Sequence, residues 1–581
     1  MPGSAEFVQR VVHTLETGWP TIWLRRSLVV ALIGGISLFY LLTEFRGLAT
    51  SQAMDQAQMA REIARGHFWQ TKYTRPRVIG QLLMHGKNVP QAAWIDTYNA
   101  PLPPLVNAFA LFPVKSHWKM TAADVIYVGD RAIAAMSILL FLLSVVVLFF
   151  IARRLFDQHL ALIACALVLL CNMFWQYALS GLPQMLMLLL FNATTYALVR
   201  AVEARYGGGR VGLWLALVGL GFGLLGLSHA LTIFIFVAAL IFFVFFFRPR
   251  GWAALIPLAV FAVVYFPWLV RNYLVSGNPA GLAFYSVLDG VGPTEAGWMR
   301  HISLNLEGAA GPLAFEDKVV RNFFLQAGNL FGYFGYSVVA IIFFASLLYG
   351  FRRRESGTFR WMLLTMWMGA VGGMSIFGLT EEQRFAANQL HLLFVPLMTC
   401  YGLAFLLVQW RRLKIQLRVA RIGFITLLFL LCALPFIFTL PGLKPPEGTI
   451  RWPPYVPPYI AVLNDWMKPN EITASDMPWA VAWYADRRAL FVPETVKEMT
   501  DISDYRILGG PVYGLYLTPI SGSENKLGDI TKGEYNGWAG VISRSVNLET
   551  FPLKWAVLLG LDNECIFLSD HNREEAAAAA R

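Results

Sequence analysis

Long apolar stretches alternate with short polar turns along most of the first 440 residues. A helix needs about 20 apolar residues to cross a hydrocarbon core of about 30 Å. The pattern predicts about eleven or more spans, over residues 27–47, 128–151, 159–175, 181–199, 211–228, 230–247, 252–270, 331–350, 360–379, 388–408 and 420–440. We therefore expect a polytopic α-helical membrane protein.

Basic residues gather in every second turn, for example at Arg153–Arg154 and at Arg411–Arg412. Because Lys and Arg are enriched in cytoplasmic loops, these turns and the N-terminal segment, residues 1–26, are expected in the cytoplasm. Three longer segments then face outward: residues 48–127, residues 271–330 and everything after about residue 441.

Composition supports the membrane assignment, since 57% of the residues are hydrophobic and only 14% are charged. A soluble domain averages about 25% charged residues, so an ordinary soluble enzyme is excluded. The net charge of +11 is largely explained by the arginine-rich turns, and it therefore does not indicate a nucleic-acid partner. The five cysteines show neither a disulfide framework nor a metal-binding spacing.

Composition changes sharply after residue 440, where a proline-rich linker begins. Beyond it, helical patterns alternate with short strand patterns, the strands being expected at Ile472–Ala474 and Ala489–Val492. This alternation predicts a small extracytoplasmic α/β domain. The domain organisation is thus residues 1–26, a membrane domain over 27–440 that includes the outer loops 48–127 and 271–330, the α/β domain over 441–570, and a low-complexity tail over 571–581.

The segment that follows the first predicted span favours a helix ended by Gly66. On this helix Asp55 and Glu62 share one face but stand about 10 Å apart along the axis, too far to act on one proton. Asp55 is therefore a candidate lone base at the membrane surface. The alternative is that Asp55 is the N-cap of the helix, with Gln58 completing a capping box.

Four short motifs stand in the outward segments. They are Asp55 followed by Ala60-Arg61-Glu62-Ile63-Ala64-Arg65-Gly66, the segment Tyr98-Asn99-Ala100-Pro101-Leu102-Pro103-Pro104, the run Pro267-Trp268 to Arg271-Asn272 with Gly277-Asn278-Pro279, and the stretch Ala474 to Arg488. Together they resemble the bacterial lipid-dependent GT-C glycosyltransferases, the superfamily of protein O-mannosyltransferases and aminoarabinose transferases. The resemblance implies a GT-C-like fold and a catalytic role for Asp55.

The chain departs from this superfamily at two positions. Gln56 stands where members often have a second acidic residue, and Gln184 stands where related chains frequently carry one. A two-carboxylate site for a divalent metal is therefore not favoured, and a metal-independent mechanism or a reduced activity is expected.

Transfer from a polyprenyl-phosphate sugar needs a base for the acceptor proton and positive charge for the departing phosphate. The candidates besides Asp55 are cations and aromatic or acidic residues of the outward segments, namely Arg384, Arg271, Lys72, Arg75, Glu62, Tyr98 and Trp69. Arg384 is equally well explained as a partner of Glu381 or Glu382. His229 and His391 are interpreted as packing residues, because no metal-binding spacing surrounds them.

We therefore expect a glycosyltransferase of the bacterial inner membrane. It would move a sugar from a polyprenyl-phosphate lipid to an acceptor glycan, lipid or protein on the outer face. A transporter or flippase of a lipid-linked glycan is the main alternative, and it predicts ionisable residues at mid-membrane depth and broken helices. Gln56 and Gln184 also leave open a non-catalytic scaffold of a glycan assembly complex.

Overall fold

The structure is a computed structural model. It describes residues 19–121, 123–289, 291, 297–303, 312–379, 381–382, 385–415, 417–439, 456–522, 526–543, 551–560 and 564–579. The chain forms two compact units, Met1–Arg46 and Gly47–Arg581. The first unit contains helix α2 (Trp19–Phe39), which continues into the π-helical turn η1 (Tyr40–Glu44).

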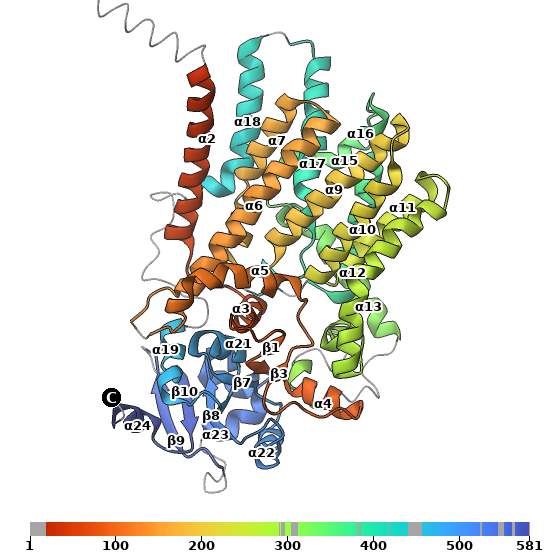
Figure 1. The fold of residues 1–581 in the computed structure, drawn as a ribbon. Coiled ribbons are helices and arrows are strands. Elements are labelled where there is room, and N and C mark those ends of the chain that lie inside the picture. The colour runs from red at the N-terminus through yellow and green to blue at the C-terminus, as the bar shows by residue number, and fades with distance from the viewer. Residues whose placement is uncertain are drawn as a thin grey trace, which may run out of the picture. The chain divides into compact units, whose positions relative to one another are not determined.

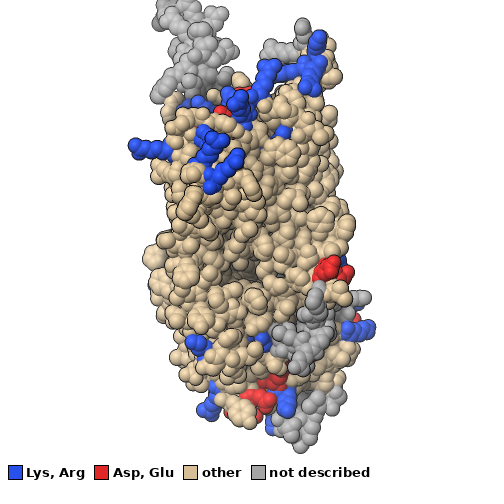
Figure 2. All heavy atoms as spheres, turned by 90° about the vertical axis from the view of Figure 1, so that its right-hand side faces the viewer, with Lys and Arg blue, Asp and Glu red and all other residues tan. Residues whose placement is uncertain are grey.

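A bundle of long apolar helices forms the larger part of the second unit (Figure 1). Its helices are α6 (Val128–Leu155), α7 (Gln158–Leu169), α8 (Asn172–Leu179), α9 (Gln184–Gly207), α10 (Val211–Ser228), α11 (Thr232–Phe246), α12 (Trp252–Ser276), α15 (Val338–Ser346), α16 (Arg354–Phe377), α17 (His391–Arg412) and α18 (Arg418–Ile437). On the face shown in Figure 2, charged residues gather toward the two ends of the molecule, and a wide uncharged band lies between them. The protein is thus a helical membrane protein.

The predicted count of eleven spans is not confirmed. Among the described residues, seven helices are long and apolar enough to cross a membrane, or eight if α7 and α8, which meet at a bend of 54°, form one span. The stretch predicted as 230–247 is the 15-residue α11, and the stretch 331–350 holds the short helices α14 (Leu330–Tyr333) and α15. Helix α16 has 24 residues, but it is not among the seven.

A six-stranded sheet lies at one end of this bundle (Figure 1). Its order is β2 (Tyr73–Thr74), β7 (Arg488–Phe491), β6 (Ile472–Ser475), β8 (Val512–Leu517), β10 (Cys565–Ser569) and β9 (Trp555–Leu559). The first four strands in this order are parallel, and β10 is antiparallel to both of its neighbours. We call the described residues from 456 to 579 the sheet domain. Its edge strand β2, however, comes from the first outer loop.

The crossovers of the sheet domain are short. After β6 the chain forms α21 (Pro478–Ala480) and the π-helical turn η6 (Val481–Ala485) before it enters β7. Helix α22 (Val496–Asp504) then leads to β8, which lies on the other side of β6. Trp483 and Tyr484 of η6 both donate hydrogen bonds to the carboxylate of Asp130, in the first turn of α6, at 2.6 and 2.9 Å. These bonds fasten the sheet domain to the helix bundle.

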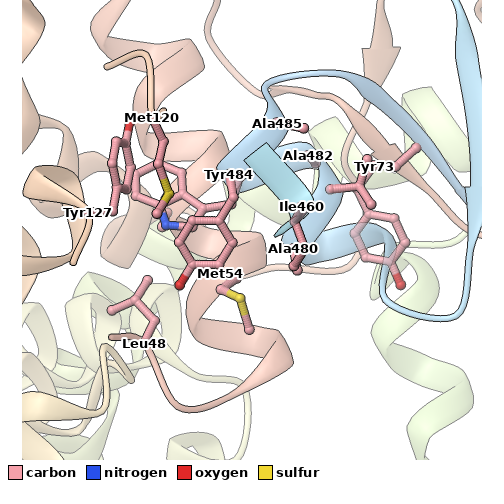
Figure 3. Close-up of a cluster of buried hydrophobic side chains, with 14 of the residues drawn as sticks. Leu48, Met54, Tyr73, Met120, Tyr127, Ile460, Ala480, Ala482, Tyr484 and Ala485 are labelled. Atoms are coloured by element: carbon pink, nitrogen blue, oxygen red, sulfur yellow. The ribbon is translucent and has the colours of Figure 1, made fainter. Parts of the chain in front are cut away.

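Helix α3 (Ser51–Ala64) lies between the bundle and the sheet domain (Figure 1), and every residue from Ala53 to Ile63 is buried. Apolar side chains from α3, η6 and the chain near Tyr127 form one cluster around it (Figure 3). Burying each large apolar side chain contributes about 1.5–3 kcal/mol, so α3 is held firmly. The first outer loop continues with β1 (Gln70–Thr71), α4 (Pro76–Met84), β3 (Trp94–Ile95) and α5 (Leu102–Leu111).

The N-cap of α3 is Thr50, whose side chain accepts a hydrogen bond from the backbone of Ala53. Asp55 therefore lies in the second turn of the helix, and the interpretation of Asp55 as an N-cap is wrong. The capping signal of Asp55 with Gln58 misled because Thr50, which is also a favoured N-cap residue type, stands earlier in the chain and begins the helix.

Candidate functional site

The carboxylate of Asp55 is buried and is held by three side chains from separate parts of the first outer loop. It accepts hydrogen bonds from Arg75 Nη2 at 2.6 Å, from Asn99 Nδ2 at 2.9 Å and from Gln58 Nε2 at 3.1 Å. The pairing with Arg75 compensates the cost of burying a charged carboxylate. One oxygen, Oδ1, accepts only the bond from Gln58 among these three, so it retains acceptor capacity.

A second buried carboxylate, Asp96, stands beside this pair. It accepts hydrogen bonds from the backbone of Tyr98 at 3.1 Å and of Asn99 at 2.7 Å. Burial and the negative charge of Asp55 raise the pKa of Asp96 to about 6, although the nearby charge of Arg75 opposes this shift. We call Asp55, Gln58, Arg75, Asp96 and Asn99 the Asp55 cluster.

The guanidinium of Arg75 is enclosed by two aromatic rings. Its central carbon lies 4.2 Å from the ring centroid of Tyr73 and 4.3 Å from that of Tyr98. Cation–π contacts of this kind fix a guanidinium in place when it is desolvated. Arg75 therefore has a defined position against Asp55.

A cavity of about 570 Å³ lies next to the Asp55 cluster. Its wall includes the start of α3, the turn between α10 and α11, and the last turns of α12. Asn99 lines the cavity and also donates to Asp55, whereas Asp55 is not one of the lining residues. Most of the lining is apolar or aromatic, including Tyr98, Phe234, Tyr265, Trp268, Phe284 and Phe385. The face shown in Figure 2 is hollowed within its uncharged band.

Glu62 and Lys72 belong to a different group of charges, which we call the Asp486 cluster and which consists of Arg61, Glu62, Arg65, Lys72 and Asp486. Asp486 forms ion pairs with Arg61 at 2.9 Å, with Arg65 at 2.6 Å and with Lys72 at 2.6 Å. Although burial alone would raise the pKa of Asp486, these three cations hold it well below its usual range. Arg61 also donates to the backbone carbonyls of Ala482 and Trp483.

The two carboxylates that share a face of α3 thus take part in different interactions. Glu62 pairs with Arg65, with Lys72 at 3.6 Å and with His67 at 3.1 Å, and none of these contacts Asp55. Burial opposes ionisation of Glu62, but the charges of Lys72 and Arg65 hold its pKa below the usual value. The structure therefore does not bring Glu62 or Lys72 to the cavity.

Other predicted residues lie nearer to the cavity. Arg271 donates to the backbone carbonyl of Asp96 at 2.6 Å and stacks on Trp268, with 4.7 Å to the ring centroid. Trp268 lines the cavity and packs edge-on against Trp69 at 5.3 Å between ring centroids. Arg384 lies outside the described residues, so its role stays a prediction.

The two histidines differ from each other. His229 lines the cavity, and its Nδ1 accepts a hydrogen bond from the backbone of Leu231 at 3.3 Å. His391 is fully buried in α17, where its Nδ1 accepts from Trp367 Nε1 at 3.1 Å. His391 is thus a packing residue, whereas His229 is part of the cavity wall.

The two glutamines that replace acidic residues are both buried. Gln184 donates to the carbonyl of Ala387 at 2.8 Å, whereas the amide atoms of Gln56 have no hydrogen-bond partner among the described residues. Within the described ranges, no group of three or more His, Cys, Asp or Glu side chains is placed to hold a metal ion.

The sequence did not indicate Asp96 or Asn99 as site residues. Asn99 belongs to the motif that runs from Tyr98 to Pro104, and Asp96 stands two residues before it, so the resemblance pointed to the right stretch of the chain. What could not be seen is that this stretch folds back onto α3, because that contact joins residues more than forty positions apart, as in the bond between Asn99 and Asp55.

The chain was compared with known proteins. The family model for dolichyl-phosphate-mannose-protein mannosyltransferase matches residues 113–270. A search of curated proteins gives no match.

Two solved structures match most of this chain at low sequence identity. The Archaeoglobus fulgidus oligosaccharyltransferase tethered to an acceptor peptide with the NVT sequon has a TM-score of 0.53 at 13% identity, covering 88% of this chain and 70% of that one. ArnT from Cupriavidus metallidurans bound to undecaprenyl phosphate has a TM-score of 0.48 at 14% identity, covering 94% and 98%. The family match and the shared fold with the oligosaccharyltransferase confirm the resemblance to GT-C membrane glycosyltransferases.

Proposed function

We propose that this GT-C-type membrane protein transfers a sugar from a polyprenyl-phosphate donor to an acceptor outside the cytoplasm. The observation that carries the proposal is the buried ion pair of Asp55 with Arg75, which Asn99 connects to the wall of a large cavity. The donor class is supported by the family match, since dolichyl phosphate is a polyprenyl phosphate.

Asp55 is the proposed general base. The acceptor hydroxyl or amine gives its proton to the carboxylate as its oxygen or nitrogen bonds to the anomeric carbon of the sugar. The bond from that carbon to the phosphate oxygen breaks, and polyprenyl phosphate leaves with the electron pair. Because Asn99 stands between the cavity and Asp55, its side chain must turn aside before an acceptor reaches hydrogen-bond distance.

Arg271 is the proposed phosphate-binding residue among the described cations. Its Nη2 is buried and has no hydrogen-bond partner in the described part of the chain, and its neighbour Trp268 lines the cavity. A guanidinium matches phosphate geometry with two parallel hydrogen bonds. Tyr98 and Trp69 remain proposed contacts for the sugar. Tyr98 is itself part of the cavity wall, whereas Trp69 packs against Trp268, which lines the cavity.

We place the protein in the bacterial inner membrane with Asp55 on the extracytoplasmic side. The support is the separation of charges along the bundle. Arg154 pairs with Glu203 at 3.1 Å and shares an end of α6 with Arg153, whereas Asp130 and the Asp55 cluster belong to the opposite end. Arginines at one end of the spans indicate the cytoplasmic side.

The test uses the purified full-length protein in lipid nanodiscs with a panel of polyprenyl-phosphate sugars that includes a hexose, a pentose and an amino sugar. We expect one donor to be consumed, with polyprenyl phosphate and a glycosylated acceptor, or free sugar by hydrolysis, detected by mass spectrometry. If no donor of the panel is consumed while the protein remains folded, the proposed function is wrong.

A flippase of lipid-linked glycans is a second candidate, because α7 and α8 form a bent pair and transporters place substrate sites at broken helices. Vesicles that contain the protein and a fluorescent lipid-linked sugar separate the two functions. Movement of intact lipid across the bilayer without consumption supports transport, and consumption without movement supports transfer.

A further inference from the structure

The strand that precedes Arg75 is part of the sheet domain. Strand β2 pairs in parallel with β7, with Tyr73 opposite Ala489 and Thr74 opposite Leu490. The backbone N–H of Ala489 also donates to the carbonyl of Lys72 at 2.8 Å. Since Arg75 follows β2 directly, the pairing of β2 with β7 sets where the backbone of Arg75 leaves the sheet.

The side chain of Tyr73 connects this pairing to the ion pair. One part of its ring packs edge-on against Trp479 and Phe491 of the sheet domain, at 6.2 and 6.5 Å between centroids. The guanidinium of Arg75 lies over the same ring, and it donates to Asp55. Trp479, Tyr73, Arg75 and Asp55 therefore form a continuous series of contacts from the sheet domain to α3.

We propose that the sheet domain positions the catalytic ion pair, with Trp479 holding the ring of Tyr73 and that ring holding Arg75 against Asp55. Trp479 is a positioning residue, because it acts through Tyr73. This inference rests on the proposed function, in which Asp55 must be deprotonated to accept a proton.

The ion pair holds Asp55 in place. Among the described residues, Arg75 is the one cation of the three side chains that hydrogen-bond to Asp55, and the others, Gln58 and Asn99, are uncharged. Asp96 carries charge of the same sign, and the phenols of Tyr73 and Tyr98 flank Arg75. If the guanidinium moves away, Asp55 loses its one charged hydrogen-bond partner among the described residues, so its carboxylate is no longer fixed toward the acceptor.

The experiment compares Trp479→Ala and Trp479→Phe with a matched control, Trp555→Ala, which removes a half-exposed tryptophan from strand β9 at the far edge of the same sheet. The full-length variants are assayed in nanodiscs with the polyprenyl-phosphate sugar that the wild type consumes. The measurements are kcat and KM between pH 5 and pH 8, and hydrogen–deuterium exchange of peptides covering residues 70–77 and 512–517.

For Trp479→Ala we expect kcat to fall about tenfold, because Arg75 no longer holds Asp55 in one position. KM for the donor should stay within about threefold of the wild-type value, since the donor's binding contacts are untouched. Exchange should become faster at 70–77 and stay slow at 512–517. Trp479→Phe should restore most of the wild-type profile, and Trp555→Ala should match the wild type.

A kcat within twofold of the wild-type value in Trp479→Ala, with faster exchange at 70–77, overturns the proposal. If 512–517 also exchanges fast, the sheet domain has unfolded, and Tyr73→Leu then decides. It keeps an apolar side chain but removes the ring under Arg75, and an unchanged kcat overturns the proposal. Should the wild type consume no donor, only the proposed function fails. Even then the positioning role can be tested: if hydrogen exchange at 70–77 is as slow in a folded Trp479→Ala protein as in the wild type, the positioning role is overturned.

Discussion

Helix α3 carries two clusters of charge whose surroundings differ. In the Asp486 cluster, three cations pair with Asp486 and two of them also pair with Glu62, and the side chains of Arg65, Lys72 and Asp486 are 24%, 22% and 19% exposed. In the Asp55 cluster, the carboxylate and Arg75 are almost fully buried, and Asn99 connects them to a cavity. The difference teaches that an ion pair on this helix is not by itself a sign of chemistry. The Asp486 cluster joins the sheet domain to α3, whereas the Asp55 cluster lies beside a cavity of about 570 Å³.

The largest expected effect separates the two carboxylates of α3. Asp55→Asn should lower the rate of sugar transfer by about 10²–10⁴-fold, the usual contribution of a general base, while the protein stays folded. Glu62→Gln is the matched control, since it makes the same isosteric change two turns away, and it should keep the rate within a few-fold of wild type. Transfer assays on both variants at equal protein amount check this, and an equal loss in Glu62→Gln would remove the distinction between the clusters.

At Asp486 we expect a substitution to lower stability and to leave the rate of sugar transfer almost unchanged. Asp486→Asn leaves the cations of Arg61, Arg65 and Lys72 without their shared anion, which should reduce the free energy of unfolding by about 2–3 kcal/mol, allowing for partial exposure. At low temperature, the folded fraction of Asp486→Asn should transfer sugar at nearly the wild-type rate. Thermal unfolding in detergent measures the stability.

The same ion pairs imply a dependence of stability on pH. Because the pKa of Asp486 is lowered on folding, its contribution is complete above the unfolded value of about 3.9 and is lost as the pH falls below it. The acid-induced loss of stability should therefore be smaller in Asp486→Asn than in the wild type. An acid transition of equal size in both proteins would contradict this assignment.

A smaller effect is expected from Asp96. Because its pKa is raised to about 6, the carboxyl becomes protonated as the pH falls through 6, and it then holds the amides of Tyr98 and Asn99 less strongly. Transfer should decline below pH 6, and Asp96→Asn should show a lower rate without that decline. The fold itself gains stability from this protonation, since the folded protein binds the proton more tightly, so unfolding does not explain the decline. A decline that persists in Asp96→Asn would assign it to another group.

The smallest expected effect concerns Arg271. Arg271→Lys keeps the charge but loses the second hydrogen bond to a phosphate, so KM for the donor should rise about three- to tenfold with kcat little changed. Arg487→Lys is the control, because Arg487 also donates to backbone carbonyls but belongs to the sheet domain. Initial-rate kinetics at varied donor concentration check this, and a change in kcat alone would argue against phosphate binding.

Local features of the sequence were easier to predict than long-range ones. The apolar character of the bundle follows from residue type alone, and β6 and β7 lie within one residue of the stretches expected from their alternation. The number of spans did not follow, since hydropathy does not reveal the bend between α7 and α8 or the shortness of α15. The hydrogen-bond partners of Asp55 could not be predicted from the sequence either. Arg75 was expected to bind phosphate, yet it pairs with Asp55, twenty positions earlier in the chain.

Strand β2 has a consequence for how the protein matures. Tyr73 and Thr74 leave the ribosome early, whereas their partners Ala489 and Leu490 are made only after the long apolar part of the chain. Contacts between such distant positions form late, because the intervening chain must first be closed into a loop. Arg75 can therefore take its final place only when synthesis is nearly complete. A chain interrupted before β7 would lack the strand that pairs with β2, so Arg75 would not yet be fixed against Asp55.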